Sequence, residues 1–188
     1  MGPMNYYGAK DLATSFRTVR KNTITIAEEI GEQHYGFSPA PETRTVAQTL
    51  VHIGLSPRMS QQIHAVERRK TLEGFDFPGF MQKIMAEEKA TRNKAQIIAF
   101  LREEGEKLAS WIDGLSDDFL GERVSMPPGM QPASRTRFEM ILGVKEHEMH
   151  HRGQLMLIER MVGIVPHLTR EMQARMAQMN VQAAARPA

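Results

Sequence analysis

The chain has 188 residues, of which 41% are hydrophobic and 24% charged, a composition that fits one globular domain with its own core. Its formal net charge is only +2 and its basic residues are scattered, so we expect no nucleic-acid partner. It has no cysteine, which excludes disulfides and thiolate ligands and favours a reducing, cytoplasmic location. No stretch is apolar enough to predict a signal peptide or a membrane span.

Apolar residues that recur at helical spacing predict two long helices in the first part of the chain. The first covers about residues 10–30. The second begins at Thr45, which forms a potential capping box with Gln48, and continues to about Arg69. Pro57 lies inside this second helix and cannot donate a backbone hydrogen bond, so we expect a kink there.

A short helix is predicted over about residues 80–90. A third long helix begins at Asn93, where Gln96 completes another capping pattern, and ends near Ile112. Residues 115–132 are expected to form a long connection, of the kind that is often functional. No segment shows the alternation typical of strands, so we expect no sheet.

The clearest helix begins at Thr136, which forms a capping box with Glu139, and its apolar stripe continues to Val162. A last helix is predicted over about residues 169–179. It carries methionines at helical spacing, which we expect to pack onto the body of the domain rather than to form a partner surface: Met172, Met176 and Met179. Four long helices with short extra ones, including one at the C-terminus, predict an all-α four-helix bundle.

Two histidines, His147 and His151, lie four residues apart in the fourth long helix and therefore share one of its faces. The same face carries Val144 and Leu155, so both imidazoles lie in an apolar stripe, where an unpaired polar group is costly. A divalent metal ion is the simplest partner for such a pair. The sequence therefore predicts a metal site on the inner face of this helix.

A catalytic metal site commonly uses three protein ligands, so a third side chain must come from another element. His52 is the best candidate, because the rest of its helix face is mostly apolar. His64 lies about 120° round the same helix, and we expect it not to bind the metal. Arg152 and Gln154 are candidates to line the same end of the bundle.

The sequence allows more than one role for the residues beside the histidine pair. Glu148 is the one candidate catalytic residue: it can act as a base, orient an imidazole, or have only a solvated or structural role. His150 is expected on the flank of the stripe. Residues 147–151 match the His-Glu-x-x-His pattern of metalloproteases, but the extended pattern requires glycine and histidine where this chain has Gln154 and Leu157. We therefore do not favour a protease.

Three segments resemble the DinB-like superfamily of helix-bundle metalloproteins, which includes the YfiT-type proteins. Thr45–Ile53 resembles the family's second helix, with His52 at the ligand position. His147–Leu155 resembles its fourth-helix signature, and Leu115–Leu120 resembles the segment after its third helix. The likeness extends over about residues 6–165.

This resemblance implies a four-helix bundle that holds one divalent ion, zinc or nickel most often, and that forms a homodimer. The metal ligands that it implies are His52, His147 and His151. We accordingly expect residues 1–188 to form a single domain. Its parts are a bundle core over about 6–165, an extra C-terminal helix over 166–180 and a flexible tail over 181–188.

Characterised relatives in this family include thiol-dependent S-transferases, in which the metal activates a low-molecular-weight thiol. We therefore expect a metal-dependent enzyme that acts on a small molecule, with thiol-dependent S-transfer favoured. A metal-dependent hydrolase, in which hydroxide replaces thiolate, is the nearest alternative. Two further possibilities stay open: a non-enzymatic metal- or ligand-binding module of a stress response, and a structural bundle whose histidines are only hydrogen-bonded.

Overall fold

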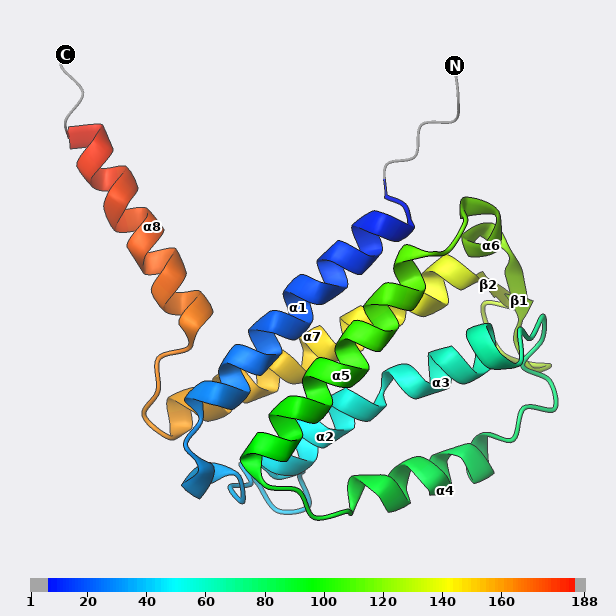
Figure 1. Cartoon of the computed structure of the whole chain (residues 1–188), viewed down its shortest axis with the longest axis horizontal. Coiled ribbons are helices and arrows are strands. Elements are labelled where there is room, and N and C mark those ends of the chain that lie inside the picture. Colours follow the sequence, from blue (N-terminus) through cyan, green and yellow to red (C-terminus); the bar gives the residue numbers. More distant parts are fainter. Residues whose placement is uncertain (1–6, 185–188) are drawn as a thin grey trace.

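Four long helical segments form the core of the structure, a computed structural model that describes residues 7–184 (Figure 1). The segments are α1 (Ala9–Glu29), α2 (Val46–Leu55) with its continuation α3 (Pro57–Gln61), α5 (Lys94–Asp113) and α7 (Arg137–Met161). Helix α1 packs against α5 and α7, and α2 packs against the same two helices from the other side. This arrangement confirms the predicted all-α four-helix bundle.

Three of the long helices begin at capping boxes, as the sequence predicts. In each box the side chain of the first residue accepts from the backbone N–H three positions on, and the second side chain accepts from the first residue's backbone N–H. The pairs are Thr45 with Gln48, Asn93 with Gln96, and Thr136 with Glu139. Because these bonds satisfy backbone donors that a helix start leaves unpaired, local sequence alone places the three starts.

The second bundle segment is interrupted where Pro57 enters it. Helix α2 ends at Leu55 and α3 begins at Pro57, which confirms the predicted break. A π-helical turn, η2 (Gln62–Val66), then follows α3, so the segment ends earlier than the predicted Arg69. A π-turn changes the direction in which the following side chains leave the helix, and such turns recur at functional sites. Here it buries the side chain of His64.

Short elements connect the bundle segments. They are η1 (Glu32–His34), α4 (Phe77–Glu88), α6 (Asp117–Gly121) and a hairpin of β1 (Arg123–Ser125) and β2 (Ser134–Thr136). The strands are antiparallel, with Arg123 opposite Thr136 and Ser125 opposite Ser134. The predicted long connection over 115–132 therefore contains a short helix and a strand, and the prediction of no sheet is wrong. Strands of three residues are too short to show an alternating pattern, and their pairing depends on contacts that the sequence does not display.

A buried ion pair separates two apolar clusters in the bundle. One cluster contains Phe16 of α1 and the other contains Ile24 of the same helix. Between them lies Arg20, which is 3% exposed and is paired with the fully buried Glu148 of α7. Gly105 of α5 makes room for this arginine, because a Cβ at that position would lie 2.7 Å from the Arg20 Cγ. The pair therefore ties α1 to α7 across the middle of the core.

The last helix, α8 (His167–Ala184), extends away from the bundle (Figure 1). Only its start contacts α1, where Arg170 pairs with Glu29. Its methionines are solvent-exposed, at 63%, 55% and 67% for Met172, Met176 and Met179. The prediction that they pack onto the domain is therefore wrong, because Gly163, at φ +84°, and Pro166 redirect the chain after α7.

Helix α8 also continues through residues 181–184, which were expected to belong to a flexible tail. The remainder of that predicted tail, residues 185–188, lies outside the described residues. None of the helices in the described range is long and apolar enough to cross a membrane.

The buried carboxyl group of Glu159, near the end of α7, should make the stability of the protein depend on pH. It is fully buried, and neither carboxylate oxygen has a hydrogen-bond partner among residues 7–184. Burial, together with the negative charge of Glu29, raises the pKa of Glu159 to about 7. Between its unfolded pKa and pH 7 the native state binds more protons, so the free energy of unfolding falls as pH rises through this window.

We expect Glu159→Gln, which carries no charge at any pH, to raise the free energy of unfolding at pH 8 by roughly 1–3 kcal/mol. The gain should shrink towards pH 5, where the wild-type carboxyl is already protonated. Urea unfolding of both proteins at pH 5, 6, 7 and 8 measures this difference. A gain of the same size at every pH would contradict it.

Candidate metal centre

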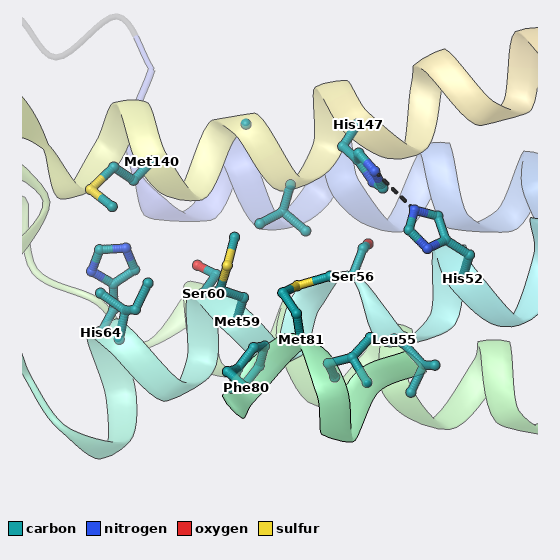
Figure 2. Close-up of a pocket in the computed structure, with 14 residues that line it drawn as sticks. His52, Leu55, Ser56, Met59, Ser60, His64, Phe80, Met81, Met140 and His147 are labelled. Carbon is teal, nitrogen blue, oxygen red and sulfur yellow. Dashed lines mark hydrogen bonds between the residues drawn. The ribbon is translucent and has the colours of Figure 1, made fainter. Parts of the chain in front are cut away.

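Three imidazoles from two bundle segments converge on one point. His52 comes from α2, and His147 and His151 come from successive turns of α7. The Nε2 atom of His147 lies 3.2 Å from that of His52 and 3.1 Å from that of His151. Figure 2 shows the rings of His52 and His147 directed towards each other. The structure thus brings together the three residues that the sequence suggested as metal ligands, with their ligand atoms all within 4.8 Å of one another.

Hydrogen bonds among the three rings cannot satisfy this arrangement. A neutral imidazole nitrogen either donates one hydrogen bond or accepts one, yet the Nε2 of His147 faces two other nitrogens. Ligand nitrogens bound tetrahedrally at about 2.0–2.1 Å from an ion lie about 3.3 Å apart. The two separations from the Nε2 of His147 are close to this value, and all three ligand atoms lie within 4.8 Å of one another, so the donor set fits one divalent metal ion.

The electrostatic surroundings keep the three rings neutral, as metal ligation requires. Burial lowers the pKa of His52 and of His151, and it lowers the pKa of His147 to about 4. The positive charge of Arg44 lowers the pKa of all three in the same direction. At pH 7 each imidazole therefore has a free lone pair for a cation.

Two further side chains lie beside outer nitrogens of the ligands, and only the one on His151 makes a hydrogen bond. Gln154 accepts a hydrogen bond from the Nδ1 of His151 at 2.8 Å, which leaves the Nε2 of that ring unprotonated. Glu88 of α4 places a carboxylate oxygen 3.4 Å from the Nδ1 of His52 and also pairs with Arg44. The sequence indicated Gln154 at this end of the bundle but not Glu88 or Arg44, because neither has a fixed spacing from the histidines.

Glu148 lies in a different environment from the imidazoles. Both of its carboxylate oxygens accept hydrogen bonds from Arg20, at 2.9–3.1 Å. It is fully buried and therefore not solvated, and its ion pair with Arg20 fits the structural alternative. His150 is exposed on the flank of α7, as expected, and its Nε2 accepts a hydrogen bond from Gln154 at 3.2 Å. His64 is buried at a distance from the three ligands and bonds instead to Arg137.

Two cavities, one apolar and one more polar, border the three imidazoles. The first has a volume of about 340 Å³ and an almost entirely apolar wall. Its lining includes His52 and His147, and the rest is mainly Leu55, Met59, Ile63, Phe80, Met81, Ile84, Met140 and Val144. The second, of about 570 Å³, is more polar and is lined by Arg44, Thr49, His151 and Gln154 among others. The ligand cluster thus borders both cavities, with two rings on the first and the third ring on the second.

Comparisons with known proteins agree with this fold. A sequence model described as the DinB superfamily matches residues 15–155. The chain is similar to the solved structure of YfiT from Bacillus subtilis, at 12% identity and a TM-score of 0.64, with 87% of this chain and 93% of that one covered. It is also similar to the DinB-like protein YjoA from the same organism, at 19% identity and a TM-score of 0.59, with coverages of 81% and 91%.

A third similar structure is the colibactin self-resistance protein ClbS, at 15% identity and a TM-score of 0.60, with 84% of this chain and 98% of that one covered. At these identities the structural likenesses show the fold alone. No protein of curated function matches the sequence.

Proposed function

The chain belongs to the DinB superfamily, and on that premise we propose that His52, His147 and His151 bind one divalent ion, zinc or nickel, for catalysis on a small molecule. We further propose that the reaction is the transfer of a low-molecular-weight thiol to an apolar electrophile. The observation that carries this proposal is the position of the three imidazoles, which border one apolar and one polar cavity.

When bound, a divalent ion supplies Lewis acidity and lowers the pKa of a thiol or of water towards neutrality. The chain itself supplies the surroundings for the two reactants. Gln154 orients the imidazole of His151 through its hydrogen bond, and the carboxylate of Glu88 lies 3.4 Å from the Nδ1 of His52. We propose that the guanidinium of Arg44, which lines the polar cavity and also pairs with Glu88, binds an anionic group on the thiol. The apolar wall of the first cavity suits an apolar electrophile.

Hydrolysis is the second candidate, because YfiT is described as a probable metal-dependent hydrolase. A hydrolase needs room for one organic substrate, since its other reactant is water. Two cavities at one ligand cluster instead suit two organic reactants, which favours transfer. A non-enzymatic metal- or ligand-binding module would keep the same three ligands and show neither activity.

The test uses protein loaded with zinc or nickel and two small thiols, anionic mercaptoacetate and cationic cysteamine. The electrophile is 1-chloro-2,4-dinitrobenzene: a carbon–sulfur bond forms, the carbon–chlorine bond breaks, chloride leaves and the thiol proton passes to solvent. We expect a metal-dependent rate gain over free thiol, larger with mercaptoacetate, and loss of that preference in Arg44→Gln. His34→Ala, which changes a histidine outside the cluster, is the matched control.

Absence of any gain over free thiol would contradict S-transfer. Metal-dependent cleavage of 4-nitrophenyl acetate without thiol would then support the hydrolase, and absence of both activities would support the binding module.

The assembly, location and partners stay predictions. ClbS is described in complex with double-stranded DNA. We nevertheless propose that this chain has no nucleic-acid partner, because its net charge is small and its basic residues are scattered. Salt-dependent binding of a labelled duplex would contradict that view. The expected homodimer, which sedimentation equilibrium can test, and the expected cytoplasmic location are proposed on the family resemblance and on the lack of cysteine, respectively.

A further inference from the structure

The apolar cavity has a polar end that the metal centre does not use. His64 of η2 lines the cavity and is only 1% exposed. Figure 2 shows its ring at the end opposite His52 and His147, facing Met140 of α7. A buried histidine at the end of an apolar cavity needs a hydrogen-bond partner for each ring nitrogen, or else its burial is costly.

Arg137 determines which nitrogen of His64 carries the proton. The Nη1 of Arg137 lies 2.9 Å from the Nδ1 of His64. A guanidinium has donors only, so this Nδ1 accepts and the ring proton lies on Nε2. Arg137 is itself 1% exposed and is held by an ion pair with Glu122, so it cannot turn away. The contact therefore locks His64 as a neutral ring whose Nε2–H is a hydrogen-bond donor.

Two buried polar groups at this end of the cavity lack partners. The Nε2 of His64 has none among residues 7–184, and neither has the hydroxyl oxygen of Ser60, which also lines the cavity. Ser60 of α3 precedes His64 of η2 by four residues and is 7% exposed. A buried donor without an acceptor costs about 1–3 kcal/mol, so two of them in one wall are unusual unless a ligand satisfies them.

From these groups we infer that His64 and Ser60 form a subsite that binds a carbonyl oxygen at the far end of an apolar substrate. The inference deepens the proposed function, because it rests on the reactive end of that substrate lying at the imidazoles. Met140 and His147, near the two ends, are seven residues apart on α7, a span of about 10 Å. At about 1.2 Å per bond of an extended chain, that span corresponds to about eight bonds.

The remaining walls suit a flexible chain of this kind. Met59, Met81 and Met140 line the cavity, and methionine side chains adapt to differently shaped apolar ligands. A volume of about 340 Å³ holds roughly ten groups of the size of water, which matches a chain of eight to ten non-hydrogen atoms. The substrate class is therefore a linear apolar molecule with its electrophilic carbon about eight bonds from a carbonyl.

Matched hydroxamic acids test the subsite on the zinc-loaded protein, because a hydroxamate anchors one end of the ligand at the metal. One series ends in a methyl ketone and the other in an isopropenyl group of nearly the same shape, with four to ten intervening methylenes. At the spacing that reaches His64, titration calorimetry should show that the ketone binds about 3- to 10-fold more tightly than its isopropenyl counterpart. At shorter spacings the two compounds should bind with equal affinity. The preference should vanish in His64→Phe and persist in His64→Gln.

A second measurement needs no metal and no variant. In metal-free protein labelled with ¹⁵N-histidine, NMR should show His64 protonated on Nε2. Addition of 2-nonanone should shift that proton, whereas 2-methyl-1-nonene, which cannot accept a hydrogen bond, should not. Equal affinities of ketone and alkene at every length, or no shift with 2-nonanone, would overturn the inference. If instead the hydroxamates bind metal-loaded and metal-free protein with equal affinity, the proposed metal centre is contradicted. The NMR result then still tests the subsite independently.

Discussion

Replacing His147 or His151 with alanine is expected to abolish stoichiometric metal binding. Their Nε2 atoms lie 3.1 Å apart, and each supplies one of three converging ligands, so either substitution leaves only two. His52→Ala should have the same effect. Elemental analysis of protein purified without chelator, followed by zinc titration, measures the loss. In the wild type, free zinc at 100 times its Kd should raise the free energy of unfolding by about 2.7 kcal/mol, and the variants should lose this gain.

Two histidine variants serve as controls for this result. His64→Ala changes a buried histidine outside the ligand cluster, and His34→Ala changes a partly exposed one, so both should retain the metal. Gln154→Ala should lie between the extremes, with metal affinity reduced about 10- to 100-fold, because the Nδ1 of His151 loses its acceptor. Loss of metal in His64→Ala together with its retention in His147→Ala would overturn the assignment. A wild type that takes up no metal would leave a bundle with hydrogen-bonded histidines.

Replacing Glu148 with alanine is expected to lower the free energy of unfolding by about 3–5 kcal/mol. The substitution leaves the guanidinium of Arg20, which is 3% exposed, as an unpaired charge inside the core. The backbone carbonyls of Leu101 and Ile53 also accept from this guanidinium, at 2.7 and 3.4 Å, but they carry no compensating charge. Urea unfolding monitored by circular dichroism gives the difference.

A matched substitution on the same helix separates the lost pair from a general effect on α7. Glu146 is exposed, so Glu146→Ala should change stability by no more than about 0.5 kcal/mol. The double variant Arg20→Met, Glu148→Leu should be more stable than Glu148→Ala alone, because an apolar pair removes both buried charges. If Glu148→Ala cost no more than Glu146→Ala, the ion pair would not support the core.

The position of Glu148 shows what a helical wheel misses. Its place beside His147 in the sequence allowed a catalytic base, a group that orients an imidazole, or a solvated or structural residue. The structure directs its carboxylate to Arg20, because α1 passes that side of α7 and presents a guanidinium there. A carboxylate beside one of the ligand rings comes instead from Glu88 on α4, more than thirty residues after His52. No spacing rule connects Glu88 with the histidines.

The methionines of α8 and the turn at His64 show two other features that helical spacing in the sequence could not predict. Helical spacing predicts that Met172 and Met176 share a face, and they do lie on one helix, but spacing does not say whether another element covers that face. For His64, the angular rule assumes an unbroken α-helix after His52. The break at Pro57 and the π-turn of η2 shift every later side chain, so its burial at the end of the cavity could not be derived from the angle.

The sequence by itself determined the helical class, the capped helix starts and the pairing of His147 with His151 on one face. These features depend on residues within about one helical turn of each other, where backbone geometry allows few arrangements. Only the tertiary structure decided that His52 reaches that pair, that Arg20 neutralises Glu148 and that Arg137 orients His64. Such contacts join separate helices, so they depend on the rotation of each helix about its axis and on its crossing angle with its neighbours. The packing of the whole core selects these angles, and no local sequence pattern encodes them.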